Sequence, residues 1–85
     1  MWLHKKQINY AWGKATTLRN RNPAVWRRDE FGNLIKAGSY GTCGEFGWEI
    51  DHRKPRAKGG TDHLRNIRAL HHETNREKSD IYPYP

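Results

Sequence analysis

Three side chains in the second half of the chain are of the types that hydrolyse phosphodiester bonds. Asp51 and His52 are adjacent, and Asn75 lies further along the sequence. Such hydrolysis needs an attacking water, a base that takes its proton, and positive charge near the phosphate, which a divalent metal ion can supply. Neutral histidine is a suitable base near physiological pH, and hard cations accept carboxylate and amide oxygens. The three residues therefore fit a metal-dependent hydrolytic site, provided that the fold brings them together.

The hydrophobic pattern predicts the elements that must position these side chains. Residues 46–51 alternate and are rich in β-forming types, which indicates a strand. A basic loop over 53–60 ends in a Gly-Gly pair, and residues 66–70 form a second strand, antiparallel to the first. A helix follows, from 71 or 72 to 79. Its charged residues, expected on exposed faces, are Glu73, Arg76, Glu77 and Lys78.

This order places Asp51 and His52 where a strand gives way to a loop, and Asn75 on a helix that folds back over the hairpin. Neighbours on a regular strand point to opposite faces. Asp51 and His52 can therefore serve one site only if the strand ends or bulges at this point. The following basic loop, with Pro55 in it, favours such an end.

The first part of the chain predicts helices. Apolar residues recur at helical spacing over 4–18, which indicates an amphipathic helix. Asn22 and Pro23 are suited to begin a second, short helix that runs to about Arg28. A turn at 31–33 leads into a short strand. The tryptophans expected to fill the core are Trp2, Trp12, Trp26 and Trp48.

Length and charge indicate one small basic domain. The chain has 85 residues, which predicts a single domain over 1–85, and a formal net charge of +7. This charge favours a polyanionic partner, although a solvated basic surface would look the same. An anionic membrane surface fits less well, because no amphipathic stretch has a clean basic face. No apolar run is long enough for a signal peptide or a membrane span, so we expect a cytoplasmic protein.

The ordered motif in the second half resembles a known family. Its residues are Asp51-His52, Pro55, Gly59-Gly60, Asn66-Ile67, Leu70 and Asn75. With these residues, the segment 46–80 closely resembles the HNH endonucleases, also called His-Me finger or ββα-metal nucleases. The resemblance implies an α+β protein with a small ββα-metal (His-Me finger) fold as its motif core, and an N-terminal helical part over 4–28 packed on the hairpin.

The resemblance also implies a role for each matching residue. Asp51 and Asn75 are implied to be the protein ligands of a divalent metal, and His52 the general base that activates water. Asn66 is implied to tie the loop and help fix the base. The basic residues expected to contact nucleic acid are Arg53, Lys54, Arg76 and Lys78.

The chain departs from the family pattern in two ways. Many relatives bind a structural zinc through two Cys-x-x-Cys pairs, whereas His71 and Thr74 stand at the positions of the second pair, and Cys43 is the one cysteine. We therefore expect no structural zinc, and aromatic packing in its place. Asn75 stands where many relatives have histidine. An amide is a weaker ligand than imidazole for Zn²⁺ or Ni²⁺, so Mg²⁺ or Mn²⁺ is the favoured ion, with Ni²⁺ or Zn²⁺ as the alternative.

Other readings of single residues stay open. His71 and His72 are expected to be a surface pair at a strand end, but either is near enough in sequence to replace Asn75 as a metal ligand. Cys43 is expected to have no catalytic duty. Trp12 and Trp48 are expected in the core rather than as base-stacking platforms.

The sequence thus predicts a metal-dependent endonuclease that hydrolyses DNA phosphodiester bonds. Two rivals remain: a nucleic-acid-binding module that has lost cleavage, and a subunit of a larger phage or restriction assembly. Because the chain is too short for a separate recognition domain, either specificity is low or the chain dimerises or works with an accessory protein.

Overall fold

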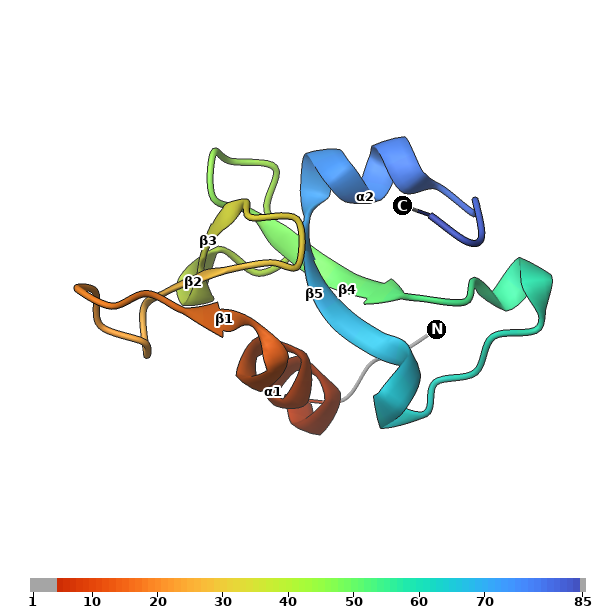
Figure 1. Ribbon diagram of the computed structural model, residues 1–85, viewed down its shortest axis with the longest axis horizontal. Helices are drawn as coiled ribbons and strands as arrows, with labels where there is room; N and C mark the ends of the chain where they lie inside the picture. The colour runs from red at the N-terminus through yellow and green to blue at the C-terminus, as the bar shows by residue number, and fades with distance from the viewer. Residues whose placement is uncertain (1–4, 85) are drawn as a thin grey trace.

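The computed structural model describes residues 5–84, so Trp2 lies outside the described residues. Two α-helices, five short strands and three 3-10 helices follow one another in this part of the chain (Figure 1). Their order is α1 (Lys5–Lys14), β1 (Thr16–Thr17), β2 (Trp26–Arg28), β3 (Leu34–Lys36), η1 (Ala37–Ser39), β4 (Trp48–His52), η2 (Arg56–Lys58), η3 (Leu64–Asn66), β5 (Ile67–His71) and α2 (His72–Lys78).

The centre of the molecule is an antiparallel hairpin of β4 and β5, followed at once by α2. Its register runs from the pair Trp48 and His71 at one end to the pair His52 and Ile67 at the other. α1 and α2 lie on opposite sides of this hairpin (Figure 1). The predicted order of strand, loop, strand and helix is confirmed, and the protein is a small α+β protein that contains the ββα arrangement.

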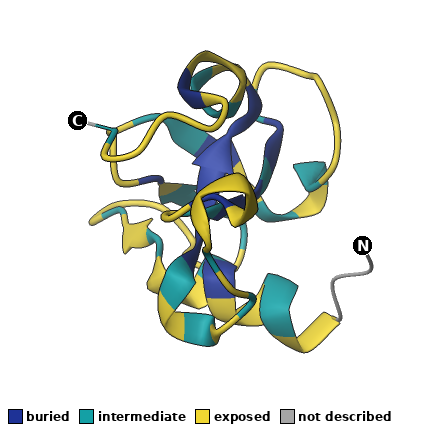
Figure 2. Ribbon diagram, turned by 90° about the vertical axis from the view of Figure 1, so that its right-hand side faces the viewer, coloured by how far each residue is buried: buried dark blue, intermediate teal, exposed yellow. Residues whose placement is uncertain are grey.

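The core lies between the hairpin and α1. Every residue of β5 is buried, and Figure 2 shows buried segments through the middle of the molecule with exposed ones around them. The buried apolar cluster is Ala11, Ile35, Trp48, Ile50, Ile67 and Ala69. The ring centroid of Trp48 lies 5.4 Å from that of Trp12, in a tilted contact, and 4.9 Å from that of Tyr40, in an edge-to-face contact. Its Nε1 donates to the Lys36 carbonyl at 2.9 Å, so its one polar atom is satisfied. Trp12 and Trp48 therefore pack in or against the core.

The predicted N-terminal helices are only partly correct. α1 ends at Lys14 instead of residue 18, because Thr16–Thr17 pair with β2 as a short strand. β-branched threonines favour this extended pairing.

The second predicted helix is wrong, since residues 23–25 form only a turn and Trp26–Arg28 are strand β2. Asn22 does accept a bond from the Ala24 amide, at 2.9 Å, as a helix cap would. Pairing of β2 with β3 then overrides the local helical signal. The predicted strand after the turn at 31–33 is confirmed as β3.

A buried aspartate joins this small sheet to the hairpin. Asp29 is 3% exposed, and one of its oxygens accepts from the backbone amides of Phe31 and Asn33 in the turn after β2. Its other oxygen accepts from the His71 amide at 2.9 Å. The turn is thereby fixed against the end of β5. No helix within residues 5–84 is long and apolar enough to cross a membrane.

Candidate active site

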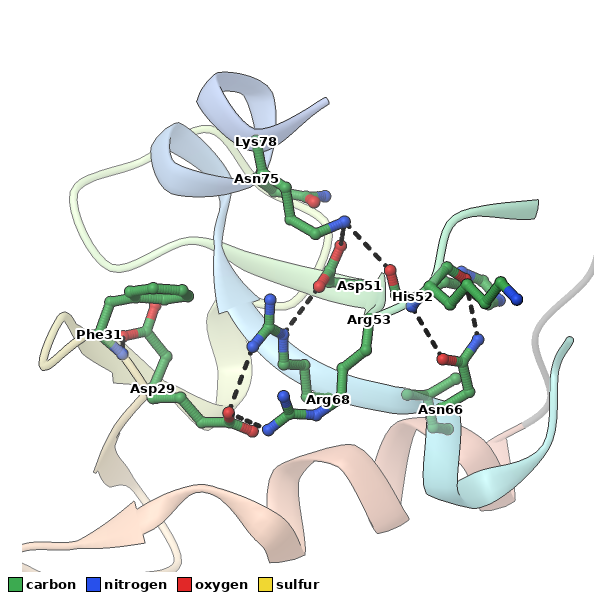
Figure 3. A network of polar contacts seen from close by, with 12 residues as sticks. Asp29, Phe31, Asp51, His52, Arg53, Asn66, Arg68, Asn75 and Lys78 are labelled. Carbon is green, nitrogen blue, oxygen red and sulfur yellow. Dashed lines mark hydrogen bonds and ion pairs between the residues drawn. The ribbon is translucent and has the colours of Figure 1, made fainter. Parts of the chain in front are cut away.

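A cavity of about 210 Å³ lies at the end of β4 and beneath α2. Asp51, His52 and Asn75 all line it, together with Lys78 (Figure 3). Asp51 and His52 reach the same cavity because His52 is the last residue of β4 and the cavity lies over that strand end. The fold therefore brings together the three residues that the sequence singled out.

The Asp51 carboxylate is buried and paired with two cations. Its Oδ2 accepts from Arg68 Nε at 2.8 Å, and its Oδ1 lies 3.1 Å from Lys78 Nζ. Arg68 lies directly opposite Asp51 in the hairpin register, so the two side chains share a face. Arg68 also reaches Glu30, at 3.2 Å. An ionised carboxylate has about four lone-pair positions, so both oxygens keep capacity to bind a cation from the cavity.

Lys78 corrects one sequence prediction. It was expected on an exposed face of the helix, but it is 1% exposed. Its ammonium donates to the His52 carbonyl at 3.1 Å and pairs with Asp51. The reason is that α2 begins where β5 ends and folds back, so its last turn crosses the end of β4. Two acceptors there compensate for the burial of the charge.

His52 is hydrogen bonded to an aspartate that sequence reasoning missed. Its Nε2 lies 2.7 Å from Asp62 Oδ1, and the other Asp62 oxygen is paired with Arg56. Partial burial acts to raise the pKa of Asp62, but the hydrogen bond with His52 and the Arg56 charge outweigh it, so this pKa is below its usual value. The only signal in the sequence was a lone carboxylate just after the Gly-Gly pair of a basic loop.

Asn66 ties the two ends of the long loop together. Its amide nitrogen donates to the Lys54 carbonyl at 3.0 Å and to the Thr61 carbonyl at 2.7 Å, and its oxygen accepts from the Lys54 amide at 2.9 Å. The loop is closed further at Gly60, where an added Cβ would lie 1.6 Å from the Lys54 carbonyl oxygen. Asn66 therefore acts through the loop, and its contacts are with backbone atoms rather than with His52.

The side-chain amide of Asn75 is oriented by Glu49. Asn75 Nδ2 donates to Glu49 Oε1 at 2.8 Å. A carboxylate only accepts, so it fixes which end of the amide faces it. The Asn75 oxygen accepts no hydrogen bond from the described part of the chain, and it is the atom that a metal ion would use.

His71 and His72 lie at the other end of the hairpin and are buried, so the expected surface pair is wrong. His71 pairs with Trp48, whereas Asp51 and His52 pair with Arg68 and Ile67. Neither histidine lines the cavity around Asp51. Their rings stack at 4.6 Å, and the His71 and His72 Nε2 atoms bond to the carbonyls of Glu45 and Gly44 at 2.7 and 2.8 Å.

His71, His72 and Glu73 place ligand atoms within 4.8 Å of one another. The second ring nitrogen of each histidine, however, already faces a hydrogen-bond donor rather than a vacant metal position. His71 Nδ1 accepts from the Glu73 amide, and His72 Nδ1 lies 3.4 Å from Arg76. This cluster therefore ties the segment 43–47 to the start of α2. Exposed Cys43 belongs to it as well, since Arg76 donates to its thiol at 3.0 Å.

The other basic side chains predicted to contact phosphates differ in whether another residue already binds them. Arg53 is exposed and paired with Glu30. Lys54 is also exposed, and its ammonium has no acidic partner among residues 5–84; it lines an open cavity of about 410 Å³ with His63 and Arg65. Arg76 is exposed beside Cys43. Of these three side chains, Lys54 is thus the one best placed to contact a phosphate.

The hairpin and helix, with an aspartate, a histidine and an asparagine around one cavity, have the ββα arrangement that the sequence predicted. Residues 41–80, a little less than half of the chain, match the family model described as HNH endonuclease. Over this segment the chain is therefore similar to the HNH endonucleases. Searches of the curated proteins and of the solved structures returned no match.

Proposed function

We propose that the protein is a divalent-metal-dependent endonuclease that hydrolyses DNA phosphodiester bonds. The observation that carries this proposal is the single cavity lined by Asp51, His52 and Asn75. The family match supports the nuclease class, and the net charge of +7 supports a polyanionic substrate.

Each residue has a role that its surroundings allow. His52 takes the proton of the attacking water at its ring nitrogen turned away from Asp62. Asp51 and Asn75 would hold the metal through oxygen atoms, and this donor set fits Mg²⁺ or Mn²⁺ better than softer ions. When bound, the ion would supply positive charge to the phosphate and the leaving oxygen. Lys78 already contacts Asp51 and must shift or share that carboxylate.

Binding energy comes mainly from the phosphate backbone. Exposed Lys54, Arg53 and Arg76 are the basic side chains proposed to make these contacts. Binding should therefore weaken steeply as salt concentration rises.

Purified protein is expected to nick or cut plasmid DNA with Mg²⁺ or Mn²⁺, and excess EDTA should abolish cleavage while circular dichroism remains native. Re-addition of the ion should restore the activity. Full activity in EDTA would contradict the metal-dependent mechanism. Metal-independent binding without any cleavage would instead favour the binding-module alternative, and activity that needs added host or phage proteins would favour the assembly subunit.

The identity of the ligand on α2 can be tested by thermal melting. Binding of Mn²⁺ to the folded state alone stabilises it by about 2.7 kcal/mol at a hundredfold excess over Kd. Asn75→Ala should lose most of this Mn²⁺-dependent rise in Tm. His71→Ala should keep the rise, although its Tm without metal falls because the bond to the Glu45 carbonyl is lost. If Asn75→Ala kept the Mn²⁺-dependent rise in Tm and His71→Ala lost it, His71 would be the metal ligand instead of Asn75.

A further inference from the structure

The Asp62 carboxylate is placed between two side chains that line the cavity. Asp62 Oδ1 lies 2.7 Å from His52 Nε2, and Oδ2 is paired with Arg56. Both His52 and Asp62 are partly buried, with side chains 18% and 27% exposed. Asp62 therefore contacts the proposed base directly, although it is not among the residues that carry the family resemblance in the sequence.

This contact fixes which nitrogen of His52 can act as a base. An ionised carboxylate only accepts hydrogen bonds, so Nε2 must carry the ring proton that it receives. Nδ1 of the neutral ring then keeps its lone pair. A base that takes a proton from water needs such a lone pair, and the second ring nitrogen sets where it lies.

The loop explains how Asp62 keeps its place. Asn66 holds the Thr61 carbonyl at 2.7 Å, directly before Asp62 in the chain. The His63 amide, directly after it, bonds to the Thr61 hydroxyl at 3.3 Å. Arg56, from η2 on the other side of the loop, holds the second carboxylate oxygen. Asn66 thus reaches His52 through Thr61 and Asp62, which gives a physical path for its influence on the base.

We propose that Asp62 is a positioning residue, which holds the imidazole of His52 in the Nε2-protonated tautomer so that Nδ1 faces the attacking water. This inference rests on the proposed nuclease function for its kinetic consequence. The tautomer itself does not depend on cleavage.

Asp62→Asn is the decisive variant because it keeps the shape of the side chain. Arg56 only donates, so it should take the amide oxygen and leave the amide NH₂ facing His52. Nε2 must then accept, and the ring proton moves to Nδ1, which removes the lone pair from the cavity. We expect kcat to fall by about 10–100-fold with KM within about threefold, as when the partner that orients a catalytic imidazole is changed. Asp62→Ala should give a mixture of tautomers and a smaller loss. Exposed Asp80→Asn is the matched control, with unchanged kinetics.

The readout independent of activity is nitrogen-15 NMR of the neutral His52 ring, which distinguishes a protonated nitrogen from one with a lone pair. Support requires Nε2–H in the wild type and Nδ1–H in Asp62→Asn. Nδ1–H in the wild type, or an unchanged tautomer and kcat in Asp62→Asn, would overturn the proposal. If the wild type cuts no DNA with any metal, the proposed function fails, and the tautomer measurement alone still decides whether Asp62 positions the ring.

Discussion

Replacing His52 with alanine is expected to slow DNA cleavage by about 10²–10⁴-fold, which is the range that general bases contribute. No other imidazole lines the cavity around Asp51, among the residues described. His52 packs at the end of β4 and is not part of the apolar core, so the fold and DNA binding should stay close to the wild type. Single-turnover cleavage and a gel-shift titration on the same preparation measure the two effects separately.

His63→Ala is the matched control. His63 is an exposed histidine in the same loop, and its Nδ1 accepts only from the Arg65 amide, at 3.1 Å. Its loss should leave the cleavage rate nearly unchanged. Equal rates for His52→Ala and the wild type would show that the base is a different group.

The largest loss of stability is expected from Arg68→Met. Arg68 is a buried arginine that bonds to Asp51 at 2.8 Å and to Glu30 at 3.2 Å. Removal of one partner of a buried pair leaves an uncompensated charge and typically costs about 3–5 kcal/mol. Lys78 still pairs with Asp51, which places the expected loss near the lower end. Chemical denaturation measures the free energy of unfolding.

Arg53→Met is the control that tests whether burial, rather than loss of a positive charge, causes the loss of stability. Arg53 pairs with the same Glu30, but its side chain is 48% exposed. An exposed pair contributes at most about 1 kcal/mol, so this variant should unfold close to the wild type. If Arg68→Met lowered the free energy of unfolding no more than Arg53→Met does, the buried pairs of Arg68 would contribute no more to stability than the exposed pair of Arg53.

The part of the fold nearest the motif could be predicted because its signals are local. Alternation over β4, the Gly-Gly loop end and the apolar run of β5 each specify their own element, and α2 follows. The region 15–28 could not be predicted in the same way. Asn22 and Pro23 carry a real helix-start signal, and the pairing of Trp26 with Lys36 across the sheet overrides it.

The same distinction holds at the candidate site. Asp51, His52 and Asn75 were found because their order in the chain forms a motif. Asp62, Glu49 and Lys78 act through contacts that arise only after folding. The burial of Lys78 depends on the sharp junction of β5 and α2, which carries the last helical turn over the end of β4. Lys78 was predicted to be exposed only because its side chain is charged.

One end of the hairpin carries the cavity, and the other end holds segment 43–47 in place. This separation affects how the sequences of such domains can change during evolution. From the pair Trp48 and His71 to the pair His52 and Ile67, four residue steps span about 13 Å. Changes at sites this far apart usually add without coupling. A lineage can therefore exchange the histidine and carbonyl contacts of His71 and His72 for another means of holding segment 43–47, while the cavity at the other end retains its chemistry.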